Sequence, residues 1–325
     1  MLSTRVTEML GIRHPIVCGG MMWVGRAELA SAISNAGGLG MLTALAQPTP
    51  DALREEIARC KSMTDKPFGV NLTVLPSVVP RPYAEYRQAI IESGVKVVET
   101  VSSDPREHFA AFKAAGITII HKCTSARHAV TAERLGADII SIDGFECAGH
   151  PGEDDVPGLV LIPATVDKVK IPVIASGGIG DGRGLVAAMA LGAEGVNMGT
   201  RFCATQEAPI HPNVKQLLVE NSERDTHLIY RQFRNTGRVA RNAVSNKVAE
   251  ILKDPDAKYE HVADLVKGLK NREALETGDV DAGLIWGGQI QGLIHDIPDC
   301  RTLLDRMIAD ASQIIRSRLG KIAAA

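Results

Sequence analysis

Short apolar runs recur along the N-terminal part of the chain, and each is followed by glycine or polar residues. They are too short and too rich in β-branched residues to be helices, so we predict that each is a buried strand. The eight runs are Pro15–Cys18, Leu39–Leu42, Phe68–Leu72, Lys96–Thr100, Ile117–His121, Asp138–Ile142, Pro172–Ala175 and Gly195–Met198.

Segments with helical start and stop signals separate most of these runs. Thr49-Pro50 and Asp104-Pro105 each place a capping residue before a proline in the first turn. Another helix begins at Thr124 or Ser125 and ends at Gly136. This alternation predicts a parallel sheet covered by helices, and eight units favour a closed (β/α)8 TIM barrel over an open doubly wound sheet.

The strand–helix rhythm stops after Phe202. We predict only helical segments between residues 225 and 297, namely Arg241–Leu252, Val262–Leu269 and Leu284–Ile294. Residues 226–297 are therefore expected to form a helical substrate or lid domain over the C-terminal mouth of the barrel. The amphipathic segment Arg301–Leu319 is expected to return to the barrel wall, so that residues 1–225 and a C-terminal helix, 298–325, form the barrel domain.

Composition narrows the class of protein. The 36 basic and 38 acidic residues nearly balance and only 4% of residues are aromatic, so we expect no nucleic-acid partner. No apolar run approaches the ~18 residues of a membrane span, and no signal peptide is visible. Six cysteines without a C-x-x-C pair suit reduced thiols and predict no metal site. These features predict a cytoplasmic protein, and they are compatible with an oligomer.

Two glycine-rich turns follow the last two predicted strands. They are Ser176-Gly177-Gly178 and Gly199-Thr200. Missing side chains let backbone N–H groups approach an anion, and the loops after strands 7 and 8 of such barrels often hold a phosphate. Glycine turns also join strands to helices in many α/β folds, but two of them at consecutive strand ends favour a phosphate site.

Two titratable side chains lie where the strands end, which is where active sites of such barrels are found. Lys122 either pins the electron-rich edge of a cofactor or pairs with Asp143 on the next strand, and the phosphate turns favour the cofactor role. His150, in the loop after the sixth strand, either donates a proton or hydrogen bond to a substrate or is a surface histidine. Spacing alone does not decide between these readings. We assign His121 to packing.

A proline-rich segment, residues 75–83, leaves the third predicted strand at the mouth. Its three prolines make it semi-rigid. We interpret it as a gate over the ligand in preference to a merely longer connection.

Several motifs together carry a family resemblance. They are HPIVCGGMMWVGRAELASAISNAGGLG, FGVNLTVLP, IHKC, DGFECAGHPGEDD, IASGGIGDGRG, NMGTRF and RNTGRVARNAVS. Over nearly its whole length the chain resembles the nitronate monooxygenase (2-nitropropane dioxygenase) family of FMN-dependent TIM barrels. Within that family it is most similar to the bacterial NADH:quinone reductases.

The resemblance implies one non-covalent FMN and assigns residues to it. Those expected at the isoalloxazine ring are Gly20, Met21, Met22, Thr73, Lys122 and Gly149. Those expected at the phosphate are Ser176, Gly177, Gly178, Gly199 and Thr200. His150 would face the substrate near N5, and Pro76 would lie in the gate. Met22 departs from the pattern, because close relatives carry a glutamine there, and a possible hydrogen bond is lost.

The implied reaction is ping-pong. NADH delivers hydride to N5 of FMN, and a quinone then takes two electrons, with Lys122 and His150 as the catalytic candidates. Alternatives are a nitronate monooxygenase that oxidises alkyl nitronates with O₂ and a flavin-dependent enoyl-thioester reductase. An inosine-monophosphate-dehydrogenase-like barrel would use Cys147 as a nucleophile, but the E-C-A-G-H setting does not match. A non-catalytic phosphate-binding module would leave Lys122, His150 and the gate unexplained.

Overall fold

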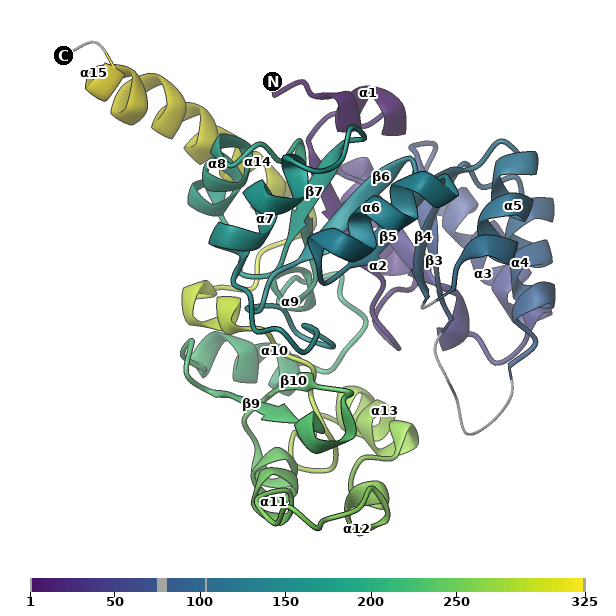
Figure 1. Ribbon diagram of the computed structural model, residues 1–325, viewed down its shortest axis with the longest axis vertical. Helices are drawn as coiled ribbons and strands as arrows, with labels where there is room; N and C mark the ends of the chain where they lie inside the picture. The colour runs from purple at the N-terminus through teal and green to yellow at the C-terminus, as the bar shows by residue number, and fades with distance from the viewer. Residues whose placement is uncertain (1, 75–80, 103, 324–325) are drawn as a thin grey trace.

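The computed structural model describes residues 2–74, 81–102 and 104–323, and in it eight parallel strands form one sheet (Figure 1). The hydrogen-bonded order is β1-β8-β7-β6-β5-β4-β3-β2. A parallel bridge joins Val17 of β1 to Leu39, the residue directly before β2, so the sheet closes into the predicted (β/α)8 barrel. The strands are β1 (Ile16–Cys18), β2 (Gly40–Thr43), β3 (Phe68–Val74), β4 (Val97–Ser102), β5 (Thr118–Cys123), β6 (Ile139–Asp143), β7 (Val173–Ser176) and β8 (Gly195–Met198).

Helices and short helical turns surround this barrel (Figure 1). Two predicted caps are present, since the side chain of Thr49 accepts from the N–H of Ala52 and that of Ser125 from the N–H of His128. Asp104 is not the N-cap of the next helix, because Pro105 takes that position and the helix begins at Arg106. Gly136 ends its helix with φ 107°. These elements are α1 (Arg5–Leu10), α2 (Ala27–Asn35), η1 (Ala44–Ala46), α3 (Pro50–Met63), α4 (Tyr83–Glu92), α5 (Arg106–Ala114), α6 (Ala126–Leu135), α7 (Gly158–Val166), α8 (Gly182–Ala190), α9 (Thr200–Cys203) and α10 (Pro212–Glu220).

The barrel core explains why the strands read as continuous apolar runs. Every residue of β6 and β7 is buried, because helices cover the outer face while side chains fill the interior. From α3, Leu53 and Ile57 pack into this core. Each fully buried side chain of this size contributes roughly 1.5–3 kcal/mol through the hydrophobic effect.

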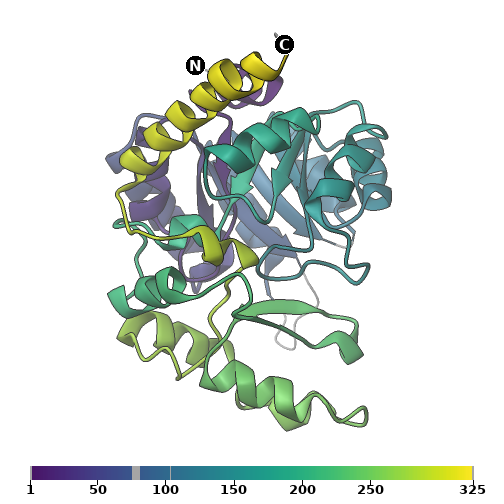
Figure 2. The same ribbon diagram turned by 90° about the vertical axis from the view of Figure 1, so that its left-hand side faces the viewer.

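A second region lies at the C-terminal ends of the strands, below the barrel in Figures 1 and 2. It has its own hydrophobic cluster, which includes Ile229, Val239, Val248 and Leu284. Its elements are β9 (Thr226–Ile229), η2 (Arg231–Phe233), β10 (Gly237–Ala240), α11 (Ala243–Ile251), α12 (Glu260–Ala263), α13 (Gly268–Thr277) and η3 (Gln289–Leu293).

The second region is not built only of helices, and this corrects the sequence analysis. β9 and β10 pair as an antiparallel hairpin, whose two strands were too short for their alternation to stand out. The predicted helix Val262–Leu269 is split between α12 and α13, with Gly268 at the start of α13. The predicted helix Leu284–Ile294 is only a short 3₁₀ turn, because Gly287 and Gly288 disfavour a helix there.

The C-terminal segment meets the expectation in part. α14 (Cys300–Gln313) buries Leu303, Leu304 and Met307 against α8 and α2 of the barrel. In the following π-helical turn η4 (Ile314–Leu319) only Ile314 packs against the core, and η4 and α15 (Gly320–Ala323) project from the body (Figures 1 and 2). Over the described ranges, no helix combines the length and the hydropathy needed to cross a bilayer.

Candidate active site at the barrel mouth

The two glycine turns lie at the ends of neighbouring strands, β7 and β8. Gly177 and Gly178 adopt φ values of 88° and 72°, which glycine tolerates best. A Cβ at Gly177 would lie 2.9 Å from Cβ of Cys147, and one at Gly178 would lie 3.2 Å from Cβ of Glu146. Conformation and packing therefore both require glycine in this turn.

In the second turn, neither backbone conformation nor packing requires the glycine. Gly199 has φ −117°, and a Cβ there would make only an ordinary contact with Sδ of Met21 at 3.5 Å. Within the described part of the chain, the backbone N–H groups of Gly178, Gly199 and Thr200 donate to no other group. Unpaired N–H groups on two adjacent turns form a donor set suited to a phosphate.

The turn after β1 is held by hydrogen bonds from its backbone to side chains of β2 and β4. The N–H of Gly20 donates to Oε1 of Glu99 at 2.8 Å, and a Cβ at Gly20 would lie 2.2 Å from Cγ of Asn71. Met21 donates its N–H to Oγ1 of Thr43 at 2.9 Å. Met22 is 40% exposed, so its side chain lies at the surface of the mouth.

Glu99, on β4, is a residue that sequence analysis did not single out. It is fully buried, and its Oε1 accepts hydrogen bonds from the N–H of Gly20 and Nδ2 of Asn71, both at 2.8 Å. Its Oε2 accepts from Nδ2 of Asn197 at 2.9 Å. Thr73 joins the same network by donating to Oδ1 of Asn71 at 3.0 Å. The available signal was one acidic residue inside an apolar strand, since buried carboxylates need partners.

Lys122, near the end of β5, pairs with Asp143 at the end of β6, with Nζ 3.2 Å from Oδ1. This is the alternative that the sequence analysis ranked second. Oδ1 of Asp143 accepts no aligned hydrogen bond in the described chain, so the contact is an ion pair. Burial disfavours the charged lysine, but Asp143 and Glu99 outweigh that effect and raise the pKa of Lys122. The ammonium group therefore stays protonated at neutral pH.

Gly149 and His150 follow β6 in the next loop. Gly149 has φ 79°, and a Cβ there would meet no protein atom within 4 Å. The His150 ring is exposed but stands 5.6 Å from the Trp286 ring at 35°. Surrounding protein lowers the pKa of His150, although the carboxylate of Glu153 opposes this. A neutral, solvent-accessible imidazole thus lies beside an indole.

The loop after β6 is tied to the hairpin of the second region. Both carboxylate oxygens of Glu153 bind Thr236, its N–H at 2.8 Å and its hydroxyl at 2.5 Å. Arg231 donates to both carboxylate oxygens of Asp155 at 2.7 and 2.8 Å. Sequence analysis missed these ties because it expected no hairpin.

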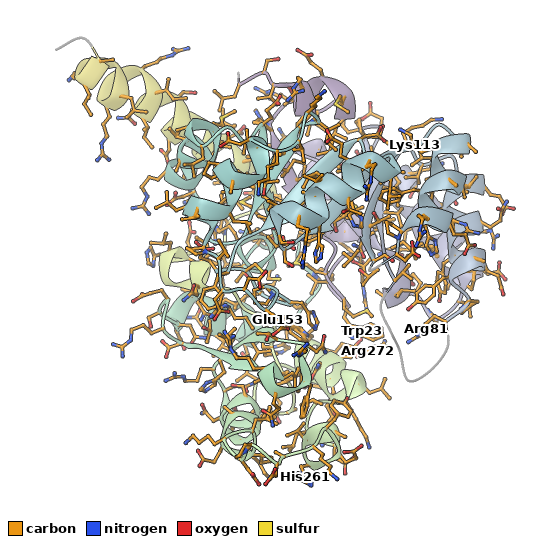
Figure 3. The ribbon with its side chains drawn as sticks, in the orientation of Figure 1. Trp23, Arg81, Lys113, Glu153, His261 and Arg272 are labelled. Atoms are coloured by element: carbon orange, nitrogen blue, oxygen red, sulfur yellow. The ribbon has the colours of Figure 1, made fainter. Side chains whose placement is uncertain are left out.

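A further contact joins the barrel to the second region at the turn after β1. The guanidinium of Arg272, on α13, lies 5.0 Å from the centre of the Trp23 ring, and Figure 3 shows the two side chains next to each other. Trp23 adopts φ 66°, which is uncommon for a tryptophan. The mouth is therefore bordered on two sides by contacts with the second region.

Three further residues named from the sequence are Pro76, Cys147 and Ser176. Pro76 lies outside the described residues. Cys147 is buried, which raises the pKa of its thiol and leaves little thiolate for a nucleophilic role. The serine of the first turn, Ser176, is also buried.

Comparisons with known proteins agree on one family. The family model described as nitronate monooxygenase matches residues 3–310. The (3aS,4S,5R,7aS)-5-hydroxy-7a-methyl-1-oxo-octahydro-1H-indene-4-carboxyl-CoA dehydrogenase of Rhodococcus jostii (strain RHA1) is 34% identical, over 95% of this chain and 96% of the relative. A probable nitronate monooxygenase of Staphylococcus saprophyticus is 31% identical, over 97% of this chain and 99% of the relative.

A solved structure supports the same assignment. FabK from Thermotoga maritima superposes with a TM-score of 0.90 at 36% identity, covering 99% of this chain and 100% of that chain. The chain therefore belongs to the nitronate monooxygenase family of oxidoreductases, and that membership implies a bound flavin.

Proposed function

We propose that this chain is an FMN-dependent NADH:quinone oxidoreductase with a ping-pong cycle. The observation that carries the proposal is the pair of adjacent rings of His150 and Trp286, whose centroids lie 5.6 Å apart at the mouth. Nicotinamide and quinone rings are planar, and an aromatic wall suits both. A neutral imidazole can hydrogen-bond a quinone oxygen, whereas it adds no charge to hold an anionic nitronate.

The residues present fit FMN. The free N–H groups of Gly178, Gly199 and Thr200 would hold its phosphate, together with Ser176 and Gly177. Gly20, Met21, Met22, Thr73 and Gly149 would border the ring. When bound, FMN would supply a two-electron carrier that accepts hydride at N5.

Lys122 and His150 would act on opposite edges of that ring. Lys122, kept protonated by two carboxylates, would place a cation at the N1–C2 edge where negative charge develops. His150, as a neutral imidazole, would donate a hydrogen bond from a ring nitrogen to the second substrate, and only its protonated form could give that substrate a proton.

We also propose that the chain divides by role. Residues 1–225 with the C-terminal helix 298–325 would form the FMN-binding barrel, and residues 226–297 would form a substrate or lid domain. The separate hydrophobic cluster of the second region supports this division. Pro76 would contribute to a gate.

A second candidate is an oxidoreductase acting on a coenzyme A thioester. The relative from Rhodococcus jostii, by its name a carboxyl-CoA dehydrogenase, favours this candidate. The family name itself keeps a nitronate monooxygenase as a third possibility.

Anaerobic stopped-flow absorbance of the purified flavoprotein separates these activities. Fast bleaching of the flavin by NADH, with slower bleaching by NADPH and reoxidation by benzoquinone, is the expected result. Bleaching by propyl-2-nitronate but not by NADH would favour the monooxygenase. Reoxidation by an enoyl-CoA in place of benzoquinone would favour the thioester reaction. Protein without any flavin would overturn all three.

A further inference from the structure

Arg238, on β10, is a buried cation that the proposed reaction does not use. It belongs to the motif RNTGRVARNAVS, is 2% exposed, and forms no ion pair with a carboxylate of the described chain. Burial lowers the pKa of Arg238, with partial compensation from Cys147 and Glu146, but a guanidinium remains protonated at neutral pH. Burying such a charge costs free energy unless its N–H groups are satisfied, so its contacts are informative.

The guanidinium of Arg238 holds the start of the loop after β6. Nη2 and Nε donate to the carbonyl oxygen of Phe145 at 2.9 and 3.3 Å. The same group lies 4.6 Å from the centre of the Phe145 ring. Nη1 donates to Oγ1 of Thr226 on β9 at 2.8 Å, which fixes the guanidinium to its own hairpin. Only a planar, forked cation can make these contacts at once.

The backbone of Arg238 holds the other end of the same loop. Its N–H donates to the carbonyl oxygen of Gly149 at 2.7 Å, and its carbonyl oxygen accepts from the N–H of Gly149 at 3.2 Å. This is an antiparallel bridge between β10 and the residue that precedes His150. The positive φ of Gly149 turns the chain at that point.

The residue before Arg238 supports the wall against which His150 packs. A Cβ at Gly237 would lie 3.2 Å from the Trp286 ring, so the indole rests on this strand. The N–H of Ala240 also donates to the carbonyl oxygen of Ile285 at 2.7 Å, which aligns the segment before Trp286 with β10. The loop after β6 and the indole of Trp286 are thus both supported by β10.

We propose that Arg238 is a positioning residue that fixes the orientation of His150 at the mouth. Its side chain binds Phe145, its backbone pairs with Gly149, and Trp286 packs against the same strand. β10 therefore supports both the loop that leads to His150 and the ring beside it. This inference rests on the proposed role of His150 in facing the substrate. Small displacements of a group that acts on substrate reduce turnover steeply, because reaction requires close alignment.

The primary test compares Arg238→Lys with Arg231→Ala in the full flavoprotein. Lysine keeps the charge but loses the fork, whereas Arg231→Ala removes another tie between the same loop and hairpin, from a side chain that is 41% exposed. We expect Arg238→Lys to lower kcat with NADH and benzoquinone by about ten- to a hundredfold, with a smaller change in KM. Arg231→Ala should stay within about twofold.

A second readout does not depend on turnover. The imidazole proton resonance of His150, identified by its loss in His150→Asn, is followed by NMR against pH. In the wild type its pKa lies below the ordinary value, and in Arg238→Lys we expect it to move toward about 6.5 as the ring leaves its surroundings. Guanidinium added to Arg238→Ala should restore part of both signals.

If Arg238→Lys does not fold, Thr226→Val replaces it, since that change removes a single acceptor of the guanidinium. We expect a loss of about threefold in kcat and a shift of the His150 titration in the same direction. Turnover and titration both equal to those of Arg231→Ala would overturn the positioning role. A wild type that does not reduce quinones, but whose His150 titration still responds to Arg238→Lys, would overturn the proposed function and leave the positioning role standing.

Discussion

On the barrel side of the mouth, the fully buried Glu99 accepts hydrogen bonds from Gly20, Asn71 and Asn197. On the side of the second region, the loop after β6 is held by contacts that range from buried to solvent-exposed. Arg238 is buried, Glu153 binds Thr236 part-way out, and Arg231 pairs with Asp155 at the surface. A buried network is costly to break because unpaired polar groups cannot turn to water. Substitutions on the barrel side should therefore mainly lower the free energy of unfolding, whereas substitutions on the loop side should mainly lower turnover by displacing His150.

The largest effect should come from Glu99→Ala, which tests the barrel side directly. It leaves the N–H of Gly20 and Nδ2 of Asn71 without their acceptor, and Nδ2 of Asn197 keeps only Oγ of Ser141. We therefore expect the free energy of unfolding to fall by about 3–5 kcal/mol. Urea denaturation measures the change. Glu99→Gln should lose less, because its amide oxygen still accepts. A loss below about 1 kcal/mol for alanine would show that the network is not a main support.

The next largest effect should come from Lys122→Met, which tests whether this half-buried cation contacts the cofactor in addition to pairing with Asp143. We expect flavin reduction by NADH to slow by about a hundredfold and the FMN dissociation constant to rise, since a cation at the ring is lost. Stopped-flow absorbance and FMN fluorescence titration measure these quantities. The control is Lys113→Met, whose lysine pairs with Asp138 at the surface of α5 (Figure 3). Unchanged FMN affinity and turnover in Lys122→Met would restrict the lysine to its ion pair.

Acid should destabilise the barrel side through His121, which neighbours Lys122 on β5. Burial lowers the pKa of His121 to about 4, so the ring stays neutral in the folded chain while the unfolded chain takes up a proton. Stability present above about pH 6.5 is therefore lost as the pH falls toward about 4, by at most about 1.4 kcal/mol per pH unit. Unfolding of the wild type and His121→Leu across this window measures the difference. Equal slopes would exclude His121 as the cause.

The smallest effect should come from Arg231→Ala at the outer end of the loop side. Exposed ion pairs contribute little, so we expect a loss of less than about 1 kcal/mol in the free energy of unfolding. Thermal unfolding at low and high salt measures it. A loss comparable with that of Glu99→Ala would erase the contrast between the two sides.

The sequence predicted the barrel better than the second region. Apolar runs such as Pro172–Ala175 and caps such as Thr49 and Ser125 act over a few residues, and the structure confirms them. The hairpin of β9 and β10 escaped because its strands are short and its pairing also depends on the loop after β6. The predicted helix Leu284–Ile294 is wrong for two reasons. Gly287 and Gly288 disfavour a helix, and the carbonyl oxygen of Ile285 instead accepts a hydrogen bond from the N–H of Ala240 on β10.

By itself the sequence determined the eight-unit barrel, the glycine turn at Gly177 and Gly178, and the places of Lys122 near the end of β5 and of His150 in the loop after β6. These features depend on local backbone preference and on the period of apolar residues. Only the tertiary structure decided that Lys122 pairs with Asp143, that Glu99 collects its donors, and that Arg238 clamps the loop before His150. The reason is separation along the chain, since Gly20 and Glu99 are 79 residues apart and Phe145 and Arg238 are 93 apart. Such contacts form only when folding brings distant strand ends together.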